Sequence, residues 1–274
     1  MNILQINPRL STAIFGAALA LCASTVGAAV PADTAEQKGF EVAARSDRSD
    51  SGFGDSIVEL KMILRNAAGK ETTRDLYLKT LEKPNEEVGD KSLIVFSNPP
   101  DIGGTALLSY AKILEADDQW LYLPALKRIK RISSANKSGP FVGSEFAFED
   151  FTSQELNKYK YKYLRSESCG ELTCDIVERY PRYKNSGYSK QVGWVDQLDH
   201  QIRKIDFYDR RGDLLKTLTL GEYRQYDNRY WRPHRLQMIN HQTKKSTDLV
   251  YSDFKFNTGL SSRDFKKVVL KRTR

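Results

Sequence analysis

The alternation of apolar and polar residues predicts a chain of antiparallel strands. In residues 57–64, Val58, Leu60, Met62 and Leu64 alternate with more polar positions, as in a strand with one buried face. Further strand-like segments, separated by turn-forming residues, lie at 71–81, 92–96, 105–111, 120–123, 126–132, 158–164, 173–180, 191–195, 201–208, 213–223, 230–240 and 244–256. With few helices between them, these strands predict a mainly β protein whose antiparallel sheet curves strongly into an open barrel.

The first residues predict a segment for export. One base, Arg9, precedes an apolar run over residues 13–26 that ends in small residues. This is typical of a secretory signal peptide, with cleavage expected after Ala28. A lipoprotein alternative depends on Cys22, but a bulky leucine precedes that cysteine, so we expect residues 1–28 to be a cleaved signal peptide.

The rest of the chain is predicted to form one domain with a short N-terminal extension. Residues 29–54 contain a helical pattern that starts at Thr34 and ends near Arg45, followed by a flexible connection. Residues 55–274 hold the predicted strands, and this length suffices for one substantial core.

Aromatic residues are concentrated in the middle of the chain. Trp120 and Tyr122 begin a strand-like segment, and four phenylalanines follow in a loop rich in small residues: Phe141, Phe146, Phe148 and Phe151. So much aromatic surface either fills the core of the protein or lines an apolar ligand site. We take these six residues as candidates for a hydrophobic cavity or its lid.

The formal net charge is +8. Arg9 lies in the predicted signal peptide, so the exported chain carries about +7. Bases are densest at residues 127–131 and 266–274. In an exported protein they favour anionic lipid headgroups, transient contact with a membrane surface or an acidic partner, and not nucleic acid. The four bases Lys127, Arg128, Lys130 and Arg131 are candidate headgroup or partner contacts, although a solvated strand face explains them equally well.

Two cysteines remain after removal of the predicted signal peptide, Cys169 and Cys174. An even count in an oxidising compartment favours a disulfide across a turn at Gly170 and Glu171. So short a loop contributes only about 2 kcal/mol. The alternative of a redox-active or metal-binding pair lacks the Cys-x-x-Cys spacing.

Motifs for catalysis are missing from the sequence. The three histidines, His200, His234 and His241, have no metal-ligand spacing, and no nucleophile elbow, phosphate loop or dinucleotide fingerprint occurs. Glu149 and Asp150 could serve as acid and base in a glycosidase, but adjacent side chains usually point apart. We therefore expect a protein without enzymatic activity, metal or cofactor, in which Asp150 caps or braces a loop.

Several ordered motifs carry a resemblance to a known family: NPPDIGGTALL at 98–108, WLYLPALKRIKRI at 120–132, GSEFAFED at 143–150, YSK at 188–190, WVD at 194–196 and FYD at 207–209. Together they resemble the outer membrane lipoprotein-sorting proteins, which are periplasmic LolA-like proteins of Gram-negative bacteria. The resemblance covers almost all of the chain after the predicted signal peptide. The cysteine pair is an addition to the family pattern.

This resemblance implies a LolA/LolB-like incomplete barrel lidded by helices, with a cavity that accepts the acyl chains of lipids or lipoproteins. It also implies that the protein works together with a resistance-nodulation-division (RND) transporter of the inner membrane. The alternative is a non-enzymatic accessory subunit of such a transporter without its own lipid. If the aromatic loop binds lipid, replacing Phe146 or Phe148 with Asp should abolish binding and leave the sheet folded.

Overall fold

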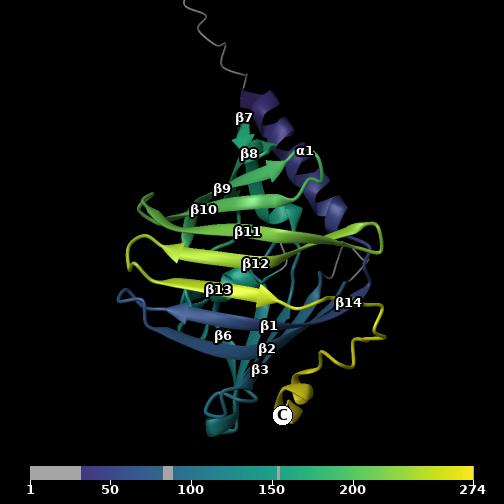
Figure 1. Cartoon of the computed structure of the whole chain (residues 1–274), viewed down its shortest axis with the longest axis vertical. Coiled ribbons are helices and arrows are strands. Elements are labelled where there is room, and N and C mark those ends of the chain that lie inside the picture. Colours follow the sequence, from purple (N-terminus) through teal and green to yellow (C-terminus); the bar gives the residue numbers. More distant parts are fainter. Residues whose placement is uncertain (1–31, 83–88, 153–154, 274) are drawn as a thin grey trace, which may run out of the picture. The chain divides into compact units, whose positions relative to one another are not determined.

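The computed structural model describes residues 32–82, 89–152 and 155–273 (Figure 1). One α-helix, α1 (Ala32–Asp50), precedes the sheet. The strands are β1 (Asp55–Arg65), β2 (Glu71–Leu81), β3 (Lys91–Asn98), β4 (Ala106–Tyr110), β5 (Asp118–Leu123), β6 (Arg128–Ile132), β7 (Tyr159–Cys169), β8 (Leu172–Pro181), β9 (Tyr188–Asp196), β10 (Ile202–Asp209), β11 (Leu214–Tyr226), β12 (Tyr230–Asn240), β13 (Ser246–Tyr251) and β14 (Lys255–Phe256). Short 3-10 turns are η1 (Pro124–Leu126), η2 (Ser134–Asn136), η3 (Phe141–Gly143), η4 (Phe148–Phe151), η5 (Leu156–Lys158) and η6 (Lys267–Arg272).

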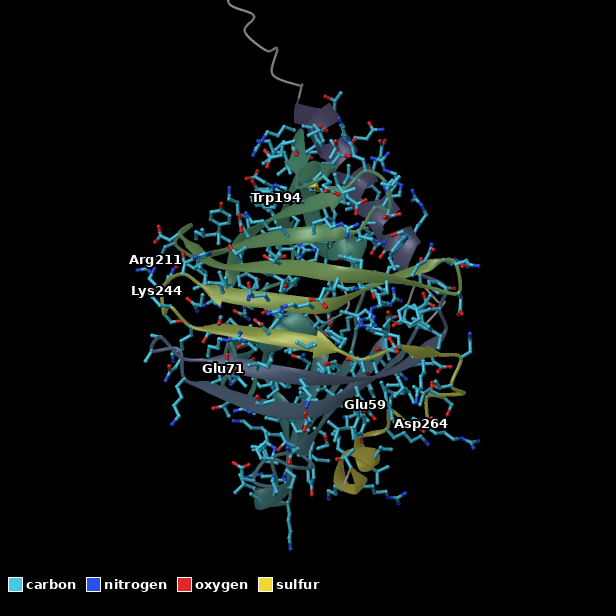
Figure 2. All side chains as sticks on the ribbon, in the orientation of Figure 1. Glu59, Glu71, Trp194, Arg211, Lys244 and Asp264 are labelled. Atoms are coloured by element: carbon cyan, nitrogen blue, oxygen red, sulfur yellow. A yellow bond between two sulfur atoms is a disulfide. The ribbon has the colours of Figure 1, made fainter. Side chains whose placement is uncertain are left out.

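All described strands belong to one antiparallel sheet that does not close. Its order is β6-β5-β4-β3-β2-β1-β13-β12-β11-β10-β9-β8-β7, with β14 beside β1. The strands β6 and β7 are therefore the two edges. The predicted mainly β fold with an open, curved sheet is confirmed, and exposed charged side chains such as Glu59, Glu71 and Lys244 project from its strands and turns (Figure 2).

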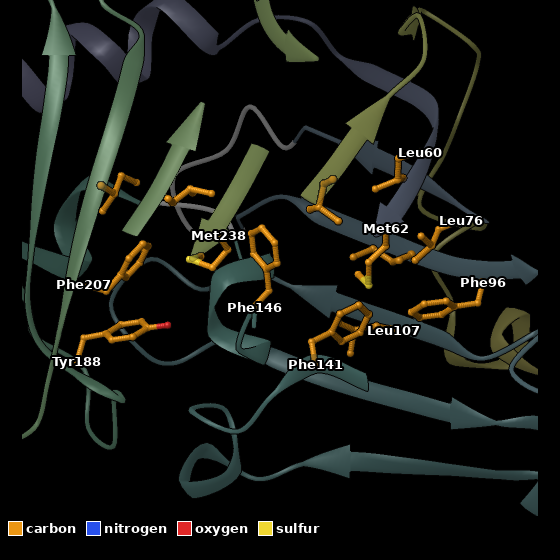
Figure 3. Packing of buried hydrophobic residues seen from close by; sticks show 14 residues of the cluster. Leu60, Met62, Leu76, Phe96, Leu107, Phe141, Phe146, Tyr188, Phe207 and Met238 are labelled. Atoms are coloured by element: carbon orange, nitrogen blue, oxygen red, sulfur yellow. The ribbon is translucent and has the colours of Figure 1, made fainter. Parts of the chain in front are cut away.

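The segment that follows β6 fills one part of the concave side. We call residues 133–151 the plug. Phe141 and Phe146 of the plug are 0% and 3% exposed, and they pack among residues from both halves of the sheet, including Phe96 and Met238 (Figure 3). The Phe141 ring centroid lies 5.6 Å from that of Phe96. The plug thus takes the place of the strand pairing that would be needed to close a barrel.

A second core lies on the other face of strands β3 to β5. Trp120 packs there against Leu93 and Leu108, and the C-terminal residues Phe265 and Leu270 complete the cluster. The C-terminal segment is therefore bound to the outer face of the sheet by fully buried side chains.

The helix α1 extends further than the sequence predicts. Its helical pattern is expected to end near Arg45, but the helix continues to Asp50, and the predicted flexible connection is wrong over these residues. Tertiary contacts outweigh the weak local propensity, since Ser49 accepts a hydrogen bond from Gln201 at 3.0 Å and Asp50 pairs with Arg232. The predicted signal peptide lies outside the described residues and stays a prediction.

The hairpin between β7 and β8 contains the predicted disulfide. Cys169 and Cys174 are bonded, with their Cα atoms 5.8 Å apart. Gly170, at the turn, has a φ of 72°, a conformation that favours glycine. The prediction of a local cross-link at this turn is confirmed.

Removing the Phe141 side chain should test how much the fold depends on the plug. Phe141→Ala should lower the free energy of unfolding by about 3–5 kcal/mol, because a fully buried ring is lost from a packed core. Urea unfolding monitored by circular dichroism measures this change. Leu126→Ala, at a side chain 68% exposed, is the control and should change stability by less than about 0.5 kcal/mol; equal effects would contradict the role of the plug.

Candidate functional site

A cavity of about 520 Å³ lies on the concave side of the sheet, beside α1. Aliphatic and aromatic side chains from the strands and the 3-10 turns form most of its apolar wall: Leu78, Ile94, Phe151, Leu156, Val177, Val195, Ile202, Ile205, Leu220, Leu236, Tyr251 and Phe254. Ala43, Ser46, Asp47 and Asp50 of α1 also line it. The helix therefore covers an apolar space that the plug leaves unfilled.

The N-terminal half of α1 approaches β7 closely at Gly39. A Cβ atom at this position would lie 2.7 Å from the backbone nitrogen of Tyr163, so only glycine allows the approach. Next to it, the Lys38 ammonium lies 3.6 Å from the Tyr163 ring centroid, and Phe40 packs edge-on against Tyr161. The helix is thus held against an edge strand of the sheet.

The C-terminal end of α1 is fixed by Arg232 of β12. This side chain is buried, pairs with Asp50, and lies with its guanidinium 5.1 Å from the ring centroid of Phe53 and 5.3 Å from that of Phe256. The Glu82 carboxylate accepts hydrogen bonds from the backbone of residues 52 and 54, at 2.6 and 2.9 Å. The connection from the helix into β1 is therefore tightly bound.

One part of the cavity wall is polar and rich in carboxylates. Asp47, Asp50 and Glu82 lie close enough to interact electrostatically, and Asp50 pairs with Arg232. Asp90 also lines the cavity. Deeper in the wall, burial raises the pKa of the tyrosines Tyr161, Tyr223 and Tyr251 above its ordinary value. These phenols are neutral hydrogen-bonding groups at physiological pH. The cavity thus combines a long apolar wall with a polar, charged margin.

Most of the predicted aromatic site residues lie in the core. Phe141 and Phe146 are buried in the plug, and Phe148 packs beside them. Of the six predicted residues, Phe151 is the one that lines the cavity, and its ring centroid lies 4.6 Å from that of Phe141. An Asp at Phe146 would place a charge in the core and destabilise the fold, so that substitution cannot separate ligand binding from folding.

The remaining predicted residues lie away from the cavity. Trp120 and Tyr122 pack on the opposite face of the sheet, against the C-terminal segment. The four bases are exposed at the tip and along the edge strand β6: Lys127, Arg128, Lys130 and Arg131. Arg131 pairs with Asp118, and none of the four lines the cavity.

The acidic pair Glu149 and Asp150 braces the plug. Buried Glu149 accepts hydrogen bonds from Tyr183, Ser186 and the backbone N–H of Gly187. Asp150 accepts hydrogen bonds from the Ala147 backbone and the Tyr188 hydroxyl, each at 2.7 Å, and lies 2.6 Å from the Lys216 ammonium. The predicted bracing role of Asp150 is confirmed.

Two of the three histidines, His234 and His241, bond to neighbouring parts of the fold. His234 is 1% exposed and bonds to the Tyr226 hydroxyl at 2.8 Å and to the Tyr251 carbonyl at 3.0 Å. His241 bonds to Thr217. Within the described ranges, no group of three or more His, Cys, Asp or Glu residues is arranged to hold a metal ion. The same residues include no helix that is long and apolar enough to cross a membrane.

Sequence reasoning missed the residues that form the cavity. Alternation places Ile205, Leu220 and Leu236 on inward faces, but the same pattern describes residues of a filled core. The helix residues Asp47 and Asp50 were expected in a flexible connection. The one usable signal is Gly193 in β9, since a glycine inside a strand often leaves space for a neighbouring group.

The comparison with solved structures identifies the family. A crystal structure of an outer membrane lipoprotein-sorting protein domain from Vibrio parahaemolyticus is 52% identical in sequence. It superposes with a TM-score of 0.84, and the match covers 86% of this chain and 100% of that one. The chain belongs to the outer membrane lipoprotein-sorting protein family.

Two further solved structures have the same fold as this chain. A DUF1329 family protein from Desulfovibrio piger is 28% identical, with a TM-score of 0.81, over 86% of this chain and 99% of that one. A LolA superfamily protein from Nitrosomonas europaea is 23% identical, with a TM-score of 0.64, over 88% and 100%. A family model described as "Uncharacterized protein" matches residues 89–272. None of the curated proteins matches the chain.

Enlarging Gly39 should release α1 from the sheet. In Gly39→Leu the new side chain would overlap the β7 backbone, and overpacking typically costs about 1–3 kcal/mol. We expect amide hydrogen exchange in α1 to accelerate by at least about tenfold, with exchange in β11 and β12 unchanged. Gln37→Leu adds the same side chain at an exposed position of α1 and should leave exchange unaltered. Unchanged exchange in the Gly39 variant would refute the close-approach argument.

Glu149 should make stability depend on pH. Burial, followed by the nearby Asp150 carboxylate, raises the pKa of Glu149 above 4.5. The folded protein keeps this proton where the unfolded chain has lost it, so the free energy of unfolding falls as pH rises from 4.5 to the raised pKa. Glu149→Gln lacks this contribution. The unfolding free energy of wild type minus variant, measured between about pH 4 and 7, should therefore decrease as pH rises; a constant difference would argue against a raised pKa.

Proposed function

We propose that this protein is a periplasmic carrier that binds a lipid, or the acyl chains of a lipoprotein, in the cavity beside α1. The observation that carries the proposal is the cavity itself, with a volume of about 520 Å³ and a largely apolar wall. Protein ligand sites usually span about 300–1,000 Å³. An apolar space of this size, covered by a single helix, suits an extended hydrocarbon chain.

The energetics suit a carrier. Each buried methylene stabilises binding by about 0.8 kcal/mol, so an acyl chain supplies most of the affinity without specific polar contacts. The polar margin around Asp47, Asp50 and Arg232 offers hydrogen-bonding partners to a headgroup or peptide. The apolar wall then provides affinity, and the polar margin provides selectivity.

The relatives support the same function. The Vibrio parahaemolyticus relative is named for lipoprotein sorting and matches this chain over 86% of its length. The predicted signal peptide agrees with a location in the periplasm. An RND-type transporter of the inner membrane remains the partner that the family resemblance predicts. A binding protein of this kind needs no catalytic group, in keeping with the structural roles of Glu149, Asp150 and His234.

The bound lipid can be identified directly. The protein is purified from the periplasm and analysed by native mass spectrometry, and whatever organic extraction releases is then identified. We expect about one lipid, fatty acid or acylated peptide per chain. A ligand-free mass that persists after incubation with envelope lipids would contradict the carrier function and favour an accessory subunit of a transporter.

Filling the cavity should prevent binding without disturbing the core. Gly193 lines the cavity, and a Cβ atom there would come no closer than 3.9 Å to the nearest atom, the Val177 carbonyl oxygen. Gly193→Phe, a residue with good strand propensity, should reduce the bound lipid at least about tenfold. Gly221→Phe is the matched control: position 221 follows the cavity-lining Leu220 along β11, so its side chain points to the other face. Normal lipid content in a folded Gly193→Phe variant would exclude this cavity as the site.

A further inference from the structure

Two basic segments that are far apart in the sequence meet at one end of the molecule. Residues 124–132 form the β5–β6 tip and strand β6, and residues 266–273 form the C-terminal segment, at the same end of the ribbon (Figure 1). Gly104 links them, because a Cβ atom there would lie 2.9 Å from the Thr273 carbonyl oxygen and 3.3 Å from Cγ of Pro124. Neither segment contains an aspartate or glutamate.

Most bases of these two segments, which together we call the basic end, have no acidic partner. Arg131 pairs with Asp118, and the Lys267 ammonium lies 4.1 Å from the Trp120 ring centroid. The other six bases are exposed and form no ion pair within the described part of the chain: Lys127, Arg128, Lys130, Lys266, Lys271 and Arg272. Their charges are therefore available to an external anionic surface.

Two aliphatic side chains project among these bases. Leu126 is 68% exposed and Val268 is 53% exposed. Buried Phe265 and Leu270 fix the C-terminal segment to the sheet, so Val268 is held outward by a rigid support. Exposed aliphatic residues flanked by bases are typical of protein surfaces that enter the headgroup layer of a bilayer.

Protection of a sheet edge explains only part of this surface. Charged residues on β6 would prevent edge-to-edge pairing with another sheet. The C-terminal segment lies on a face of the sheet and forms no edge, so its bases need another explanation. Edge protection also leaves the exposure of Leu126 and Val268 unexplained.

We propose that this basic end docks the protein onto membranes that contain anionic phospholipids. The bases lie near the phosphates, and Leu126 and Val268 enter the headgroup layer. A membrane fits better than an acidic protein, because two separate aliphatic side chains surrounded by mobile lysines and arginines offer no continuous apolar patch for a protein interface. This surface is distinct from the lipid cavity, since none of its bases lines that cavity.

Vesicle binding tests the electrostatic part of the proposal. The protein should sediment with vesicles of phosphatidylcholine that contain about 30% phosphatidylglycerol, but not with pure phosphatidylcholine. Binding should weaken strongly between about 0.1 M and 0.5 M salt, because screening shortens the range of the attraction. Each basic side chain near an anionic surface strengthens binding about fivefold, so Lys127, Lys130, Lys266 and Lys271 changed together to Gln should weaken it at least about a hundredfold.

A matched variant controls for total charge. Lys160, Lys184, Lys244 and Lys245 are exposed lysines elsewhere, with Lys244 at the β12–β13 turn (Figure 2). Changing these four to Gln removes the same charge and should weaken binding only a few-fold. Equal losses in both variants, or no binding of the wild type to anionic vesicles, would overturn the proposal.

Serine substitutions test the insertion of the aliphatic residues. Leu126→Ser with Val268→Ser should weaken vesicle binding about tenfold. Leu198→Ser, at a side chain 74% exposed in another turn, should have no effect. A dye attached at Leu126→Cys should shift to a less polar emission on binding, and an unchanged emission would overturn insertion. The lipid content of each variant is measured alongside, so that loss of docking and loss of the cavity ligand are distinguished.

Discussion

The sheet of this protein curves without closing, and strands β6 and β7 keep unpaired edges on either side of a gap. A curved sheet of this kind cannot bury its own concave face, because no strand pairing brings the two halves together. The plug and α1 cover that face between them. The core, the cavity and the position of the helix all follow from this incomplete closure.

The two covers are fixed by different interactions. The plug inserts phenylalanines and is held by the buried pair of Asp150 and Lys216, and breaking a buried pair leaves an uncompensated charge that costs about 3–5 kcal/mol. A second buried pair, Lys158 with Asp117, joins the last residue of η5, just before β7, to the residue just before β5. The helix is held by Val42, which is buried against Tyr161 and Val177. Its ion pair is more open, because the Asp50 side chain that pairs with Arg232 is 58% exposed. The ion pair of the plug is therefore buried on both sides, whereas that of α1 is open to solvent on one side.

Much of the fold could be predicted from the sequence, because strand alternation depends on local geometry. The strands around Val58 and Leu60 and the turn at Gly170 follow from side-chain periodicity and backbone preference. The cavity could not be predicted in this way. Alternation shows that Leu220 and Leu236 face inward, but not whether a protein side chain or a ligand lies opposite them. The sequence did not show whether the phenylalanines of the plug fill the core or line a ligand site. Their contacts with residues far away in the sequence, such as Phe96 and Met238, place Phe141 and Phe146 in the core. The last turns of α1 depend on Arg232, far away in the chain, and local propensity could not reveal them.

The aromatic enclosure of Arg232 has a mechanical consequence. It fixes the Asp50 end of α1, which is also the end joined covalently to β1, so a rotation of the helix would pivot there. A helix of 19 residues is about 28 Å long at 1.5 Å per residue. A tilt of about 10° would then displace the far end by about 5 Å, roughly one helical turn, with almost no movement at the pivot. Such a rotation would leave the carboxylates near Asp50 almost in place and would move the N-terminal end of α1 relative to the edge strand β7.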